Sequence, residues 1–81
     1  MENTQASLTS VHQEIHVLVV SPEEAADGVA EFWAGGRLIG VTCLEEGDLI
    51  LRIGPSHDDV VLGARALTKA LAEADRLLAL Y

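Results

Sequence analysis

The pattern of apolar and polar residues predicts strands in the first two thirds of the chain and a helix at its end. Four short runs are rich in β-branched or apolar residues, which is typical of strands: residues 11–20, 29–34, 37–44 and 49–53. Gly35 and Gly36 form one turn between runs, and residues 45–48 form the next. Because short connections join antiparallel neighbours, we expect a four-stranded antiparallel meander.

The last part of the chain predicts one long helix, from His57 to about Leu80. Ser56 has a side chain suited to cap its start, and Gly63 would lie inside it at a cost of about 1 kcal/mol. Apolar residues recur at spacings of three and four, which defines one apolar face: Val60, Ala64, Leu67, Leu71, Ala74 and Leu78. At 1.5 Å per residue such a helix would be about 36 Å long and would overhang the sheet.

Together these features indicate an α+β fold, an antiparallel meander sheet of about four strands packed against one long C-terminal helix. Residues 1–10 are polar and aperiodic, so we expect a disordered N-terminal tail, and residues 11–81 form a single domain. Between the first two strands, Ser21, Pro22 and Glu24 have the form of a helix start. A single helical turn and an acidic loop are both compatible with that segment.

Apolar residues fall on both faces of the predicted sheet, although the chain offers only one long helix to cover them. In the third strand, Ile39, Val41 and Cys43 share the face that we assign to the helix, and Leu38 and Leu44 point away. We therefore expect the bare face to meet a second copy of the chain. One of Phe32 and Trp33 is expected in the core, since neighbours on a strand point to opposite faces. The candidate interface residues are Phe32, Trp33, Leu38, Leu44, Ile50, Leu77, Leu80 and Tyr81.

The net charge of −8 lies in the first part of the chain. Residues 1–50 contain nine acidic side chains and one basic one, whereas residues 51–81 contain four of each. Such a surface repels phosphate, which disfavours direct nucleic-acid binding and binding to anionic membranes. It serves solubility, or it attracts a basic protein partner.

Few residues carry a pattern suited to chemistry. His12, Glu14 and His16 alternate along the first strand and share a face, and such side chains can bind zinc or another transition metal. A solvated strand face explains the same pattern. Cys43 is the single cysteine, which excludes a disulfide within the chain, favours a cytoplasmic setting, and is expected as a buried thiol. No cofactor fingerprint or apolar span of membrane length occurs, so we expect no cofactor and no membrane insertion.

These patterns favour a small, acidic, non-enzymatic interaction module, expected to be homodimeric, with an immunity, antitoxin, inhibitor or regulatory role towards a basic protein. The alternative is a small-ligand or metal-binding protein that uses the second sheet face and the strand of His12, Glu14 and His16.

Overall fold

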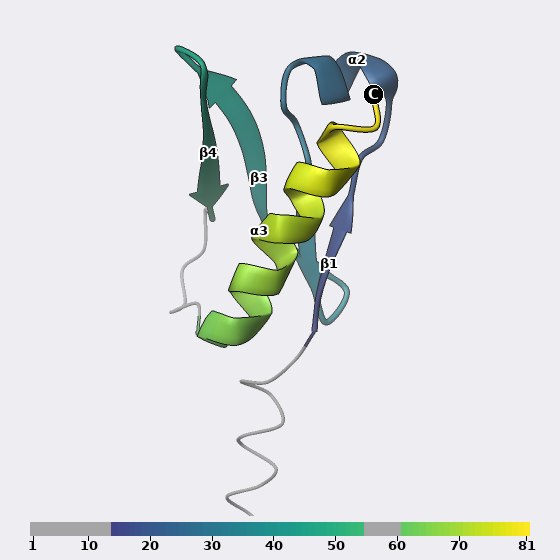
Figure 1. Cartoon of the computed structure of the whole chain (residues 1–81). Coiled ribbons are helices and arrows are strands. Elements are labelled where there is room, and N and C mark those ends of the chain that lie inside the picture. Colours follow the sequence, from purple (N-terminus) through teal and green to yellow (C-terminus); the bar gives the residue numbers. More distant parts are fainter. Residues whose placement is uncertain (1–13, 55–60) are drawn as a thin grey trace, which may run out of the picture.

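The computed structural model describes residues 14–54 and 61–81. Its elements, in chain order, are β1 (Ile15–Leu18), α2 (Pro22–Ala26), β2 (Glu31–Ala34), β3 (Arg37–Glu45), β4 (Asp48–Ile53) and α3 (Ala64–Leu78). The strands form one antiparallel sheet in the order β1-β2-β3-β4, and α3 crosses one face of it (Figure 1). The expected meander and the α+β class are therefore confirmed.

Tight turns set the register of the sheet. Gly35 and Gly36 both have positive φ, as do Glu46 and Gly47 at the next hairpin, which is the backbone that two-residue hairpin turns require. A bulge interrupts the pairing of β2 with β3, because Phe32 is opposite Gly40 whereas its neighbour Trp33 is opposite Leu38. Because of the bulge, the side chains of β3 before and after it do not follow one simple alternation, so two residues an even number apart across the bulge point to opposite faces of the sheet.

The expected long helix is wrong, because α3 contains only 15 residues. Gly63 is its N-cap, with extended backbone angles, and does not lie within the helix. Starting after Gly63 avoids the cost of a glycine in the helix interior. At 1.5 Å per residue α3 is about 22 Å long, which is longer than the four-residue strands β1 and β2, at about 13 Å each, and shorter than the nine-residue β3, at about 30 Å. The predicted helix start at Ser56 and His57 lies outside the described residues.

The core is small and lies where α3 covers β1 and β2. Its buried residues are Ala30, Phe32, Ala70 and Ala74, and half-buried side chains pack around them: Ile15, Val17, Val19, Ile39, Leu51, Leu67 and Leu78. The buried face of α3 is rotated from the one we predicted, because Ala70 is buried whereas Leu71 is 41% exposed. Alanines let the helix approach the sheet closely, and the aromatic ring of Phe32 fills the remaining space.

The buried side chain of Thr42 shows which side of β3 faces the core. The hydroxyl of Thr42 donates a hydrogen bond to the carbonyl of Gly28 (2.7 Å) and accepts one from the backbone N–H of Ala30 (2.9 Å). Thr42 is 1% exposed, so its side of β3 faces the core and the expected inward placement of Val41 and Cys43 is wrong. The polar side chain is buried at little cost because it satisfies backbone groups of the segment between α2 and β2.

The segment after β1 forms the helical turn, not the acidic loop. The N–H of Glu24 donates to the Ser21 hydroxyl (3.2 Å), and Pro22 occupies the first helical position. Gly28 follows with a φ of +73°, which ends the turn and directs the chain into β2.

Candidate interaction surfaces

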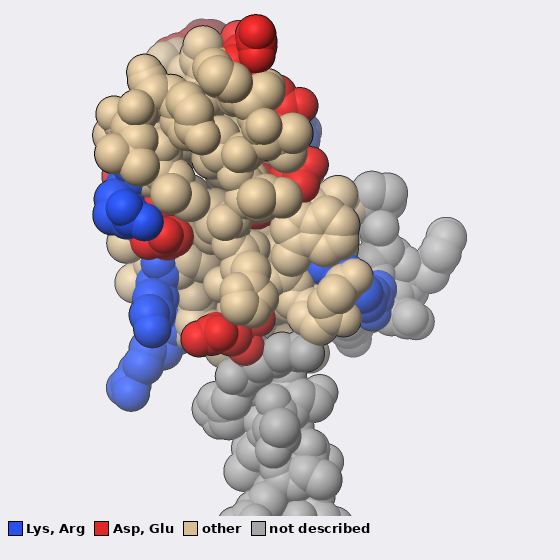
Figure 2. Space-filling model, turned by 90° about the vertical axis from the view of Figure 1, so that its right-hand side faces the viewer, with Lys and Arg blue, Asp and Glu red and all other residues tan. Residues whose placement is uncertain are grey.

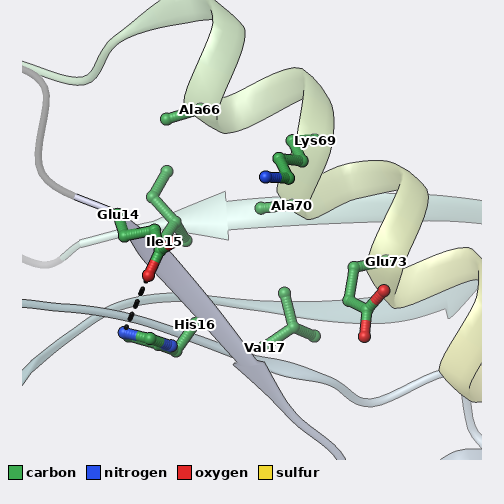
Figure 3. Close-up of a pocket in the computed structure, with 8 residues that line it drawn as sticks. All are labelled: Glu14, Ile15, His16, Val17, Ala66, Lys69, Ala70 and Glu73. Atoms are coloured by element: carbon green, nitrogen blue, oxygen red, sulfur yellow. Dashed lines mark ion pairs between the residues drawn. The ribbon is translucent and has the colours of Figure 1, made fainter.

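β1 forms an edge of the sheet beside a groove. β2 pairs with one side of β1, and within residues 14–54 and 61–81 no strand pairs with its other side. A groove of about 280 Å³ runs between this edge and α3 (Figure 3). It is lined by Glu14, Ile15, His16, Val17, Ala66, Lys69, Ala70 and Glu73. An open strand beside a helix can accept an extended segment or another strand.

Two opposite charges lie on the α3 side of the groove, Lys69 and, one turn later, Glu73. Glu73 also bonds to Arg76, with 2.6 Å between its Oε2 and an Arg76 nitrogen. The hydrogen bond from Arg76 lowers the pKa of the Glu73 carboxyl, so Glu73 carries its negative charge at neutral pH. The i, i+4 spacing of Lys69 and Glu73 is visible in the sequence, but the groove that these two side chains line depends on where α3 packs.

The predicted metal ligands are brought together only in part. Glu14 and His16 lie side by side, with 3.7 Å between Glu14 Oε1 and His16 Nε2, and both side chains are about three-quarters exposed (Figure 3). His12 lies outside the described residues. In the part of the chain that the structure describes, no three metal-ligating side chains converge. The observed pair is a solvated contact that becomes an ion pair when the histidine is protonated.

The sheet face opposite α3, here called the outer face, carries apolar side chains that no described element covers. Its members follow from the strand pairing: Leu18, Trp33, Leu38, Val41, Cys43 and Ile50. Leu18 and Leu38 are about half exposed, and the other four are partly buried. The indole N–H of Trp33 donates to Glu31 Oε1 (3.0 Å), which satisfies the polar atom and leaves the ring available for packing.

Cys43 is a half-buried residue of this outer face and not the buried core thiol that we expected. It lies opposite Ile50 in the β3–β4 pair. The side chain of Arg52 on β4 bonds to Glu45. Hydrogen bonds with Glu45 and, less strongly, with Cys43 raise the pKa of Arg52. Arg52 and Glu45 thus mark a charged margin of the outer face at β4.

The predicted interface residues separate into different places. Phe32 is fully buried beneath α3, so it is the core member of the Phe32–Trp33 pair and cannot contact a partner. Leu44 lies on the α3 side, where its Cγ would be 2.6 Å from a Cβ placed on Gly28. The others are accessible to different degrees: Trp33, Leu38 and Ile50 on the outer face, half-buried Leu77 on α3, and exposed Leu80 and Tyr81 at the C-terminus.

Acidic side chains gather at the end of the sheet where α2 lies. The carbonyl of Asp27 accepts a hydrogen bond from the Leu44 N–H (3.1 Å), which holds α2 beside the β3–β4 hairpin (Figure 1). This end, here called the acidic end, contains Glu23, Glu24, Asp27, Glu45, Glu46 and Asp48. Leu44 and Leu49 are exposed beside it. The sequence predicted the charge asymmetry, but only the fold shows that two separate acidic segments meet.

Comparison with models of protein families, with curated proteins and with solved structures returned no match. Among the described helices, none combines the length and the apolar composition needed to cross a membrane.

Proposed function

We propose that this chain is a non-catalytic protein-interaction module that acts as a homodimer and binds a basic protein through its acidic end. The observation that carries the interaction role is the outer face, a sheet surface with apolar side chains that no described element covers. Apolar side chains on a contiguous surface of a small protein are typical of interaction sites. The open edge of β1, which no strand among the described residues covers, is a separate surface at which a second copy can bind.

The acidic end supports the choice of a basic partner. Carboxylates concentrated on one surface steer an oppositely charged protein towards it and oppose acidic ones. Leu44 and Leu49 beside them would provide apolar contact once the partner is bound. This combination suits an inhibitor, antitoxin, immunity protein or regulatory subunit that covers a basic surface of its target.

The proposal gives the chain no catalytic role because the groove lacks the usual features of an active site. Its titratable side chains are Glu14, His16, Lys69 and Glu73. Glu14 and His16 are largely exposed, and Glu73 forms an exposed ion pair with Arg76. General acid–base catalysis relies on groups whose pKa values are tuned by burial or close charges.

Light scattering over a dilution series tests the homodimer. We expect a mass of twice the 8.6 kDa chain at high concentration, with dissociation on dilution. A mass of one chain at every concentration would contradict this part of the proposal.

Nuclear magnetic resonance tests the acidic end. A lysine-rich peptide should shift the amide signals of Glu46 and Asp48 and leave those of Ala72 and Asp75 on α3 unchanged. Neutral Glu46→Gln should weaken the peptide's binding, and Glu14→Gln, at a distant acidic site, should not. Shifts spread evenly over all acidic residues would contradict a defined site.

The alternative, a metal or small-ligand site, rests on the contact between Glu14 and His16. Zinc added in slight molar excess tests it through the histidine ring signals. Joint shifts of His12 and His16, abolished by His16→Ala, would favour this alternative over the interaction module. Unchanged signals would exclude a zinc site at this strand.

A further inference from the structure

The two edges of the sheet differ in how well they are protected from pairing with another chain. Charged side chains protect an edge strand, because pairing would bring them against another strand. β4 carries Asp48 and Arg52 and includes the contact of Arg52 with Glu45. β1, with the sequence IHVL, contains no acidic residue, lysine or arginine. Figure 2 shows this side of the molecule: an uncharged surface fills its upper part, where α2 and the C-terminus lie, and charged side chains lie lower down and at the margins.

The charges beside this edge are complementary to themselves. In an antiparallel pair of α3 helices related by a two-fold axis near Leu71, Lys69 lies opposite the partner's Glu73, and Glu73 lies opposite the partner's Lys69. A symmetric contact repeats each interaction twice, so the arrangement gives two attractive pairs. Ala66 and Ala70, the other α3 residues of the groove, are small enough to let a second copy approach.

The same axis passes through β1. The groove places residues 14–17 beside residues 66–73, so the middle of β1 is alongside the middle of the charged segment of α3 (Figure 3). An antiparallel β1 pair with both α3 helices on one side of the sheet has its two-fold axis perpendicular to the sheet, at His16 or Val17. Strand pairing and helix charge pairing can therefore occur together about one axis.

We propose that a second copy of this chain binds at the β1 edge, pairing β1 with β1 and forming contacts between Lys69 of each copy and Glu73 of the other. This inference rests on the proposed homodimer and assigns its surface. The two sheets become one sheet of eight strands. The outer faces and acidic ends of both copies stay accessible, so the dimer offers a basic partner two equivalent sites.

Charge reversal on α3 tests the contacts between Lys69 of one copy and Glu73 of the other. The dissociation constant of the dimer is measured by analytical ultracentrifugation. Glu73→Lys places two lysines opposite each other at both pairs, and Lys69→Glu does the same with two carboxylates. We expect each single variant to raise the dissociation constant about tenfold or more, since two exposed pairs change from attraction to repulsion. The double variant restores opposite charges and should return within about threefold of the wild-type value.

Asp75→Lys provides the matched control for Glu73→Lys. It makes the same change in net charge two residues further along α3, which is about 200° around the helix from Glu73 at 100° per residue, and Asp75 is exposed. Its dissociation constant should equal that of the wild type. Circular dichroism checks that every variant retains the fold.

Amide hydrogen exchange tests the strand pairing. Exchange in β1 should slow as the protein concentration crosses the dissociation constant, because new hydrogen bonds protect the open side of the strand. Exchange at β4, the opposite edge, should change much less and provides the internal control.

The outcomes separate this inference from the proposed function. If the wild type is a dimer but the reversal variants behave like Asp75→Lys, the β1 interface is overturned and the homodimer stands. The same follows if hydrogen exchange slows at β4 alone. A wild-type chain that is monomeric at every concentration would overturn both. Weakening by each single reversal with recovery in the double variant would support the interface.

Discussion

Replacing Thr42 with valine removes two buried hydrogen bonds without a large change in side-chain volume. The Ala30 N–H and the Gly28 carbonyl lose their hydroxyl partner, and both residues are buried. Each buried polar group left unpaired costs about 1–3 kcal/mol, so we expect Thr42→Val to lower the free energy of unfolding by about 2–4 kcal/mol. A chain of this length has about 4–12 kcal/mol in total, so the loss is a large fraction.

Urea denaturation followed by Trp33 fluorescence measures this loss. With a slope of about 1–1.5 kcal/mol per M urea for a small protein, the midpoint should fall by about 1.3–4 M. All variants are compared at one protein concentration, because self-association adds to apparent stability. Thr42→Ser keeps the hydroxyl and loses one methyl group, which costs about 1 kcal/mol.

The matched control is Thr68→Val on the exposed side of α3. The Thr68 hydroxyl bonds to the Ala64 carbonyl of its own helix and is accessible to water, so its loss should change stability by less than about 0.5 kcal/mol. If Thr42→Val is no more destabilising than this control, the two buried hydrogen bonds do not stabilise the fold as described. A Thr42→Ser variant that loses as much stability as Thr42→Val would contradict the role of the hydroxyl.

Two further substitutions test local features of the fold. Gly28→Ala should destabilise the protein by at least about 1 kcal/mol more than Gly36→Ala in urea denaturation. Both glycines have positive φ, but of the two only Gly28 would place its new Cβ against another side chain, 2.6 Å from Leu44 Cγ. Equal effects of the two substitutions would contradict this. Arg76→Ala should raise the pKa of the Glu73 carboxyl, measured by carbon-detected titration, because Arg76 is the main cause of its lowered value. The Glu73–Arg76 contact therefore stabilises the fold above the carboxyl pKa of the unfolded chain and is lost as the pH falls through the lowered folded value; an unchanged pKa in Arg76→Ala would contradict this.

The sheet was predictable from the sequence because its signals are local. Runs of apolar residues separated by Gly35 and Gly36, or by the segment around Gly47, determine both the strands and their antiparallel order. The single turn at Ser21 follows from its capping side chain in the same way. Such features depend on neighbours in the chain and not on the packing of distant elements.

The faces of β3 and the length of α3 depend on packing and were not predictable in this way. Thr42 is buried because distant backbone groups of Gly28 and Ala30 need a partner, and strand alternation does not show that need. The bulge opposite Phe32 places Leu38 on the outer face and Leu44 on the α3 side, although both have the same parity in the sequence. The periodicity of the last segment continues through Gly63, so only the structure shows that the helix begins after it.

One substitution can distinguish self-association at the outer face from self-association at the β1 edge. Leu38 is 49% exposed on the outer face and lies on β3, two strands from the β1 edge. If the dimer forms at β1, Leu38→Gln should leave the dissociation constant within about twofold of the wild-type value and change stability by less than about 0.5 kcal/mol. Analytical ultracentrifugation and urea denaturation measure the two quantities. A dimer that dissociates in Leu38→Gln while the fold persists would place self-association on the outer face and would leave the β1 edge for a different partner.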